Sequence, residues 1–315
     1  MTKRVLVTGA AGFIGSRLVE ILLSKGYQVV GIDNFRTGKR KNLEEALQND
    51  RFRLYELDIS QAVPTTDING PIDVVFHLAA ISSVKESIES PILVDSTNVV
   101  GTINVLELAR RLDVRRIVFS SSAAVYGDPE RIPITEDTPV SPLSPYAASK
   151  IAAEMYIQTY SKLYGIEGTI LRYFNVFGPR QAYSEYSGVI SIFINEALNN
   201  SPIKIEGSGE QTRSFIYVDD VAKASILAAE REGARDMVMN ISGTKAVSIS
   251  SLAQQVKELV RGTRSDILNI SPRPGDVTHS IGNIERAQRI LGFTPEMTLE
   301  DGLNHTIDWY RSHHT

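Results

Sequence analysis

The chain has 315 residues, of which 42% are hydrophobic and 22% are charged, so it can bury a full core as one large domain or two unequal lobes. Its net charge of -4 gives no general attraction to nucleic acid or to an anionic membrane, and neither is expected as a partner. The absence of cysteine excludes disulfides, thiolate metal sites and a cysteine nucleophile, and it fits a cytoplasmic location.

The N-terminal segment, the apolar stretches and the histidines argue against a signal peptide, a membrane span and a metal site. Lys3 and Arg4 precede an apolar run, as in a signal peptide, but the glycines that follow stand at turn spacing and favour folded structure. No uninterrupted apolar stretch is long enough to span a bilayer. The five histidines show no metal-ligand spacing, so no metal site is expected.

The first informative stretch follows a short apolar strand. Gly9, Gly12 and Gly15 stand between the apolar run 5–7 and an amphipathic segment, 14–25. A strand that turns through glycines into a helix presents free backbone N–H groups and the positive helix end to one point. This arrangement suits a pyrophosphate, and it predicts a dinucleotide site.

The second strand, 28–32, ends in Asp33. An acidic group at this position accepts hydrogen bonds from an adenosine ribose, and a carboxylate would repel a 2'-phosphate. The pattern therefore favours NAD over NADP. Arg36 lies close by and leaves NADP open, and a carboxylate that only caps a turn is the structural alternative for Asp33.

Apolar, strand-like runs recur after helical segments along the first half of the chain. Alternation of this kind indicates a parallel sheet covered on both faces, and the right-handed crossover rule makes it doubly wound. The expected strands are 5–7, 28–32, 53–57, 74–78, 117–120 and 169–173.

Ligands of such sheets bind at the carboxyl ends of the strands, so the residues just after each run are candidate ligand contacts. Ala79 and Ala80 are small enough for a strand end to pass close to a flat ring system. Asp58 could accept a hydrogen bond from an adenine amino group, although a turn carboxylate is an alternative interpretation.

Two long helices are expected at 92–112 and 147–164, and their apolar positions exceed one buried face each. A homodimer through these helices is our hypothesis. After about Phe174 the elements shorten and Pro and Gly become frequent. We therefore predict a Rossmann domain at 1–173 plus about 215–241, and a smaller C-terminal substrate-binding lobe at about 174–214 plus 242–315.

Tyr146 and Lys150 stand one helical turn apart on one helix face, after a loop that carries Ser122. A lysine cation and the positive nicotinamide of an oxidised cofactor would both lower the pKa of the phenol from about 10. Tyr146 is then a candidate base for a substrate hydroxyl, with Ser122 bonded to the same oxygen. Lys150 would also hold the nicotinamide ribose.

Taken together, these motifs resemble the extended short-chain dehydrogenase/reductase family, and within it the nucleotide-sugar 4-epimerases. The matching segments are 8–15 (TGAAGFIG), 33–34 (DN), 77–80 (HLAA), 120–127 (SSSAAVYG), 144–150 (SPYAASK) and 171–180 (LRYFNVFGPR). The resemblance implies a bound NAD contacted by Gly9, Gly12, Phe13, Ile14, Gly15, Asp33, Asn34, Asp58, Ile59, Leu78, Ala79, Ala80, Asn98, Tyr146 and Lys150.

Three kinds of family member compete as interpretations. The 4,6-dehydratases carry an acidic pair just after the catalytic Ser/Thr, whereas Ala123 and Ala124 stand there in this chain and cannot transfer a proton. Reductases that bind NADPH transiently are disfavoured by Asp33. The resemblance therefore favours a UDP-sugar 4-epimerase, in which hydride leaves carbon 4 for NAD and returns to the other face.

The substrate would be a UDP-sugar that contacts Ser122 and Tyr146. A diphosphate requires basic groups, which Arg213 and Arg273 can supply, although each could instead be a surface arginine. By resemblance, Asn175, Arg213 and Arg273 bind the nucleotide diphosphate and Asp276 binds its ribose.

Two residues bear on the sugar. By resemblance, Ser280 stands where some members carry a tyrosine, and a serine leaves room for an N-acetyl group. UDP-glucose/UDP-galactose is the expected pair, and the serine adds UDP-GlcNAc/UDP-GalNAc to it. Lys85 could pair with the carboxylate of UDP-glucuronate, the alternative substrate, or could be a solvated loop lysine.

Overall fold

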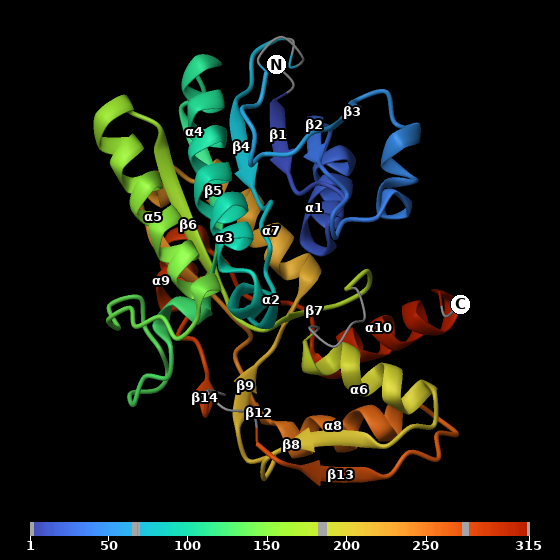
Figure 1. The fold of residues 1–315 in the computed structure, drawn as a ribbon. Helices are drawn as coiled ribbons and strands as arrows, with labels where there is room; N and C mark the ends of the chain where they lie inside the picture. Colours follow the sequence, from blue (N-terminus) through green and yellow to red (C-terminus); the bar gives the residue numbers. More distant parts are fainter. Residues whose placement is uncertain (1–2, 65–67, 69, 182–187, 273–276, 314–315) are drawn as a thin grey trace.

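A seven-stranded parallel sheet forms the centre of the computed structural model, which describes residues 3–64, 68, 70–181, 188–272 and 277–313 (Figure 1). The strand order is β11-β6-β5-β4-β1-β2-β3. The chain moves outward from β1 in one direction, returns, and continues in the other, so the sheet is doubly wound as predicted. The strands are β1 (Arg4–Thr8), β2 (Gln28–Asp33), β3 (Phe52–Glu56), β4 (Val74–His77), β5 (Arg116–Ser122), β6 (Glu167–Tyr173) and β11 (Val238–Ile241).

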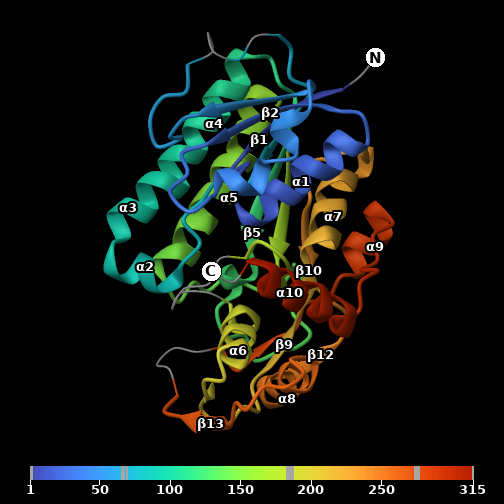
Figure 2. The ribbon, with the colours of Figure 1, turned by 90° about the vertical axis from the view of Figure 1, so that its right-hand side faces the viewer.

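The strands other than the edge strand β3 bury side chains on both faces, which is why their sequences are largely apolar. Helices α1 (Phe13–Ser24) and α7 (Val218–Glu230) pack in the core on one face. Helices α4 (Gly101–Arg111) and α5 (Pro145–Tyr164) pack on the other face. Figure 2 shows the two pairs on opposite sides of the sheet.

Helix α5 begins where its sequence requires. The Ser144 side chain accepts a hydrogen bond from the Ala147 backbone N–H at 3.2 Å, and Pro145 occupies the first helical turn, where its missing N–H has no cost. The helix ends at Gly165, which adopts a left-handed conformation with φ of 69°. The cap places Tyr146 in the first turn, next to the sheet.

The prediction of a single helix at 92–112 is wrong in detail. The structure has α3 (Pro91–Asp95), a π-helical turn (Ser96–Val100) and α4 in its place. The widened turn carries the buried Asn98, whose side chain bonds the backbone of Ile81. The segment 91–111 is long and apolar enough to cross a membrane, but half of it is buried inside the protein, as in a core helix.

The smaller lobe lies at the carboxyl ends of the strands (Figure 1). Its apolar core is formed largely by α6, α8 and α10. The remaining elements, in chain order, are α2 (Val84–Glu89), β7 (Val176–Phe177), α6 (Val189–Leu198), β8 (Ile203–Glu206), β9 (Thr212–Ser214), β10 (Ile216–Tyr217), β12 (Ala246–Ser248), α8 (Ile249–Leu259), β13 (Ile267–Ile270), β14 (His279–Ser280), α9 (Glu285–Leu291) and α10 (Leu299–His313), besides short 3-10 turns.

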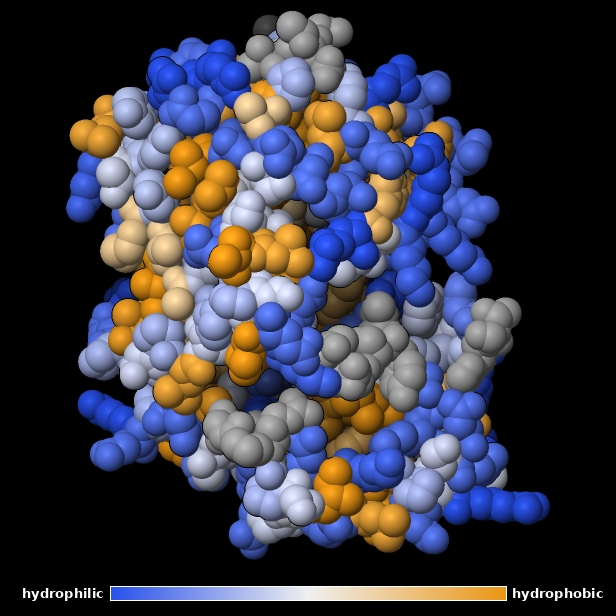
Figure 3. Space-filling model, viewed as in Figure 1, coloured by the Kyte–Doolittle hydropathy of each residue, from blue (hydrophilic) through white to orange (hydrophobic). Residues whose placement is uncertain are grey.

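The boundaries of the two domains stay a prediction. Strands β10 and β11 and helix α7 supply core side chains to the large sheet, in the region 215–241 that we placed with the Rossmann domain. Helix α9 falls in the segment assigned to the lobe, yet Ala287 and Leu291 pack in the core of the large sheet. Figure 3 shows the surface hollowed between the part that contains the sheet and the lobe.

Candidate cofactor groove and active site

The glycine turn joins β1 to α1 through very close backbone contacts. Gly9 has φ of +71°, and a Cβ there would lie 2.8 Å from the backbone nitrogen of Ala79. A Cβ at Gly15 would lie 2.0 Å from the carbonyl oxygen of Gly9. These two glycines therefore allow the chain to turn and the helix to pack against the strand end.

Gly12 has a different role. Its backbone is extended, with φ of -72° and ψ of 176°, and a Cβ there would have only the Gly9 oxygen, at 3.2 Å, within contact distance. The space beside Gly12 thus stays open at the amino end of α1, whose first residues are Phe13 and Ile14. A backbone cradle at a helix N-terminus that a side chain would fill fits the pyrophosphate of a dinucleotide.

Asp33 closes the end of β2. Its carboxylate accepts hydrogen bonds from the backbone N–H groups of Ala11 and Phe35, both at 2.8 Å. Burial raises the pKa of Asp33, and these two hydrogen bonds oppose the shift. The contact with Ala11 connects the carboxylate directly to the glycine turn.

Asn34 and Asp58 connect the ends of β2 and β3. The Asn34 side-chain amide donates to Asp58 Oδ2 at 3.0 Å, and the Ser60 backbone N–H donates to Asp58 Oδ1 at 2.8 Å. Burial acts to raise the pKa of Asp58, but the hydrogen bonds and the charge of Arg36 lower it overall. Ile59 is buried beside these residues. The predicted adenosine contacts therefore lie together at one edge of the sheet.

The end of β4 lies against the glycine turn. Leu78, Ala79 and Ala80 are half-buried, and the Ala79 backbone N–H donates to the hydroxyl of Thr8 at 3.3 Å. The structure thus brings these predicted contacts beside Gly9.

A buried polar relay through His77 lies behind this edge, and our reading of the sequence missed it. Thr102 donates its hydroxyl proton to the Asn98 carbonyl at 2.6 Å, so its oxygen accepts from His77 Nε2–H at 2.9 Å. His77 Nδ1 then accepts from the Thr8 hydroxyl at 2.7 Å. Burial lowers the pKa of His77 to about 3, with a smaller contribution from Lys150, so the ring is neutral and its tautomer is fixed.

The relay continues to the helix that carries Tyr146. The side-chain amide of Asn98 donates to the hydroxyl of Ser149 at 2.9 Å, and that hydroxyl donates to the Tyr146 carbonyl at 2.8 Å. Asn98 is a predicted cofactor contact, and in the structure its side chain also joins three segments of the fold.

Ser122, Tyr146 and Lys150 come together at the ends of β5 and α5. The side chain of Ser122 lies close enough to the Tyr146 phenol to act on its pKa. The Lys150 ammonium donates to the Ser120 carbonyl at 2.9 Å and lies 6.0 Å from the centre of the Tyr146 ring. Both Tyr146 and Lys150 are buried, so the group can hold a substrate hydroxyl away from bulk water.

In the protein without NAD the pKa of Tyr146 is raised, so its lowering stays a prediction for the enzyme with oxidised NAD bound. Burial raises the pKa of Tyr146 above 10, and the Ser122 side chain only partly offsets it. Burial also lowers the pKa of Lys150 to about 8, against the opposing charge of Glu154. The positive charge of an oxidised nicotinamide is then the factor that would favour the phenolate.

Glu154 and Arg172 form a buried ion pair below Lys150, which our reading also missed. Arg172 donates to Glu154 through Nε at 3.0 Å and through Nη2 at 2.6 Å, and the Ser121 hydroxyl donates to Glu154 at 2.5 Å. Its signal in the sequence is the spacing of Tyr146, Lys150 and Glu154, which repeats every four residues along one helix face. The pair fixes α5 against β5 and β6.

The predicted substrate contacts are divided between two regions. Asn175 donates to the Ser280 hydroxyl at 3.4 Å, which places these two side chains together in the lobe. Arg213 donates to the backbone carbonyls of Val277 and Thr278. Lys85 is exposed on α2. Arg273 and Asp276 lie outside the described residues.

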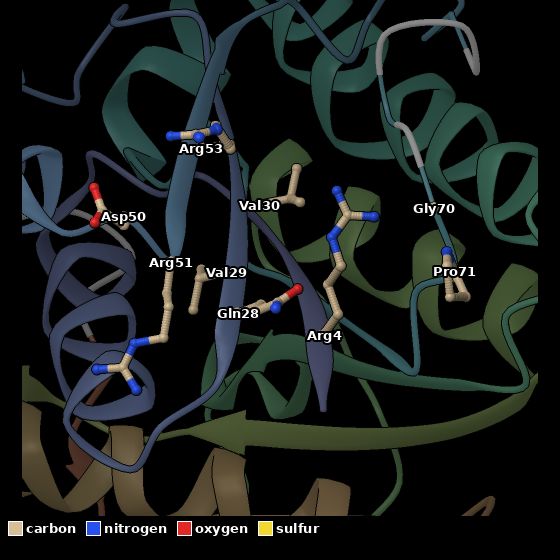
Figure 4. Close-up of a pocket in the computed structure, with 9 residues that line it drawn as sticks. All are labelled: Arg4, Gln28, Val29, Val30, Asp50, Arg51, Arg53, Gly70 and Pro71. Atoms are coloured by element: carbon tan, nitrogen blue, oxygen red, sulfur yellow. The ribbon is translucent and has the colours of Figure 1, made fainter. Parts of the chain in front are cut away.

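A hollow of about 400 Å³ lies at the opposite end of the sheet, near the amino ends of the first three strands (Figure 4). Its guanidinium groups, from Arg4, Arg51 and Arg53, point in different directions. They do not converge on one anion, and this hollow is separate from the predicted site.

Residues 5–242 match the model of the NAD dependent epimerase/dehydratase family. The chain belongs to this family. The match and the geometry of the glycine turn confirm the predicted family and the predicted cofactor, so the chain is an enzyme that uses NAD. In the part of the chain that the structure describes, there is no cluster of His, Asp or Glu that could hold a metal ion.

Individual family members are similar over nearly the whole chain. The UDP-glucose 4-epimerase of Mycolicibacterium smegmatis is 38% identical over 98% of this chain and 99% of its own. The UDP-glucuronate 4-epimerase of Thermodesulfobacterium geofontis is 36% identical over 96% of this chain and 95% of its own. The solved structure of the UDP-glucose 4-epimerase of Thermotoga maritima, with UDP-glucose, superposes with a TM-score of 0.92 at 36% identity, over 98% of this chain and 99% of that one. All are isomerases.

The glycines of the family's turn should respond differently to alanine. Gly12→Ala should lower NAD affinity at least about tenfold, because the methyl group enters the cradle, while it changes the free energy of unfolding by less than about 1 kcal/mol. Gly15→Ala should cost about 1–3 kcal/mol of stability, because its Cβ meets the Gly9 oxygen. Urea unfolding of the NAD-free proteins measures the free energy of unfolding, and NAD titration measures the affinity. Equal loss of stability in the two variants would contradict this division of roles.

Proposed function

We propose that the chain is a UDP-sugar 4-epimerase that interconverts UDP-glucose and UDP-galactose, and the N-acetylated pair in addition. The observation that carries this proposal is the Ser122–Tyr146–Lys150 group at the strand ends beside the glycine turn, in which Tyr146 and Lys150 are buried. The similarity to UDP-glucose 4-epimerases over almost the full length supports it.

The side chains present provide for moving one proton at one oxygen. NAD supplies the acceptor and donor of hydride at carbon 4. Tyr146 removes the proton of the 4'-hydroxyl and later returns it, while Ser122 holds that oxygen in line. Lys150 is fixed by the Ser120 carbonyl and would hold the nicotinamide ribose, and the positive charge of the nicotinamide would favour the phenolate. One base is sufficient for removing and returning the proton, because the 4-keto sugar rotates between the two hydride transfers and presents its other face.

The residues after Ser122 argue against loss of water. A dehydratase needs an acid and a base for the adjacent carbons, whereas Ala123 and Ala124 follow Ser122 in a 3-10 turn, Ala123–Tyr126. Ala124 contributes only its backbone N–H, which donates to the Ser122 hydroxyl at 3.2 Å. The site therefore fits reversible oxidation at one carbon.

UDP-glucuronate is the second candidate substrate. The relative from Thermodesulfobacterium geofontis, whose name carries that activity, favours it, as does the exposed Lys85 at the start of α2. The contact between Asn175 and Ser280 favours the first candidate, because a small hydroxyl at this position leaves room beside a neutral or N-acetylated sugar.

The proposal is tested by incubating the purified protein separately with UDP-galactose, UDP-GalNAc and UDP-galacturonate, and by identifying the products by NMR. We expect UDP-galactose and UDP-GalNAc to equilibrate with their 4-epimers. Tyr146→Phe should reduce the rate at least about a hundredfold while NAD stays bound. Equilibration of the uronate alone would establish the second candidate, and no epimerisation of any sugar with NAD supplied would overturn the proposal.

We also propose that the chain forms a homodimer, and that it is cytoplasmic. The support for the dimer is an apolar patch on α2, α3 and α5, which pack against one another. Figure 3 shows apolar surface over α3 and α5. Its most exposed side chains are Ile92, at 85%, and Leu163, at 66%. The other members are Ile88, Leu93, Met155, Tyr156 and Tyr164. A second copy would cover this patch by helix-to-helix packing.

The variant Ile92→Glu/Leu163→Glu should therefore be a monomer by light scattering after gel filtration, at concentrations where the unmodified protein is a dimer. Two charges in a packed apolar interface are desolvated without partners. Leu268→Glu/Ile270→Glu on β13 introduces the same two charges at exposed apolar positions outside the patch and should leave the dimer intact. An unmodified protein that is monomeric would rule the dimer out.

A further inference from the structure

An ion pair connects two segments on either side of the glycine turn. Arg36, in the loop after β2, donates through Nη2 to Glu86 Oε1 at 2.5 Å, and Glu86 belongs to α2, which follows β4. Strands β2 and β4 are the two neighbours of β1 in the sheet. The pair therefore bridges the loops that flank the carboxyl end of β1, where the glycine turn begins.

Arg36 lies at the adenosine end of the predicted cofactor groove. It is three residues beyond Asp33, and its backbone N–H donates to Asn34 Oδ1 at 3.1 Å. Its charge acts on Asp58 at the end of β3. A guanidinium in this region has the position and the fork geometry to bind a 2'-phosphate, which is the group that distinguishes NADP from NAD.

Glu86 is the better anchored member of the pair. It stands in the first turn of α2, where its backbone N–H donates to the capping hydroxyl of Ser83 at 3.0 Å. Its side chain is 25% exposed, whereas the side chain of Arg36 is 42% exposed. The backbone of Glu86 is thus fixed by the helix cap, and the longer arginine side chain reaches its carboxylate.

We propose that Glu86 is a cofactor-specificity residue that acts through Arg36. By pairing with the guanidinium, Glu86 withholds the cation that would otherwise bind a 2'-phosphate, so that Arg36 does not offset the negative charge of Asp33 at the ribose. Selection of NAD then depends on two carboxylates, one after β2 and one after β4. This inference concerns the cofactor groove and stands whichever sugar the enzyme converts.

The test is a competition between the two dinucleotides. Each purified protein is equilibrated with NAD and NADP at equal concentrations, starting from the NAD-loaded form, and bound dinucleotides are measured after gel filtration and denaturation. In Glu86→Gln the ratio of bound NADP to bound NAD should rise about fivefold or more over the unmodified protein, because the guanidinium is released to the phosphate. The ratio should return to its starting value in Arg36→Gln/Glu86→Gln.

Glu89→Gln is the matched control. Glu89 lies on the same short helix and its substitution removes the same charge, but among the described contacts it has no ion pair with Arg36. We expect it to leave the ratio unchanged. A ratio in Glu86→Gln within twofold of the unmodified protein would overturn the inference. So would a gain that persists in the double variant, or an equal gain in Glu89→Gln, because either result would assign the effect to net charge rather than to Arg36.

Discussion

The close approach of two backbones, at the carboxyl ends of β1 and β4, is the constraint on which the site depends. Because a Cβ at Gly9 would lie 2.8 Å from the backbone nitrogen of Ala79, only glycine lets the two strand ends meet there while the chain turns into α1. The hydrogen bonds of His77 connect the same two strand ends in the interior of the protein. The His77 imidazole, with a pKa of about 3, keeps one set of donors and acceptors throughout the physiological pH range.

The same contacts extend to the reacting groups. Asn98 reaches the Tyr146 carbonyl through Ser149, so hydrogen bonds connect the cofactor groove to the first turn of α5. Below that turn, the pairing of Glu154 with Arg172 attaches the helix to the sheet. The first two turns of α5, which carry Tyr146 and Lys150, are therefore held in place, as proton transfer at one defined oxygen by the proposed catalytic group requires.

Sequence reasoning is most informative where the contacts are local. The glycine spacing, the acid at the end of β2 and the pairing of Tyr146 with Lys150 each depend on neighbours within a few residues. The relay could not be predicted, because His77 bonds partners that are 69 and 25 residues away. The π-helical turn at 96–100 and the raised pKa of Tyr146 were missed for a related reason. Both depend on tertiary contacts and burial, which no periodicity reports.

The central claim is that hydride leaves and returns to one carbon while the same NAD stays in the groove. The most direct measurement uses UDP-galactose with deuterium at carbon 4, incubated with the enzyme and excess unlabelled NADH, and determines the isotope at carbon 4 of the UDP-glucose formed. The account predicts that the product retains the deuterium fully. Replacement of deuterium by hydrogen at that carbon would contradict it, because the label would then have been lost to solvent or to exchangeable cofactor.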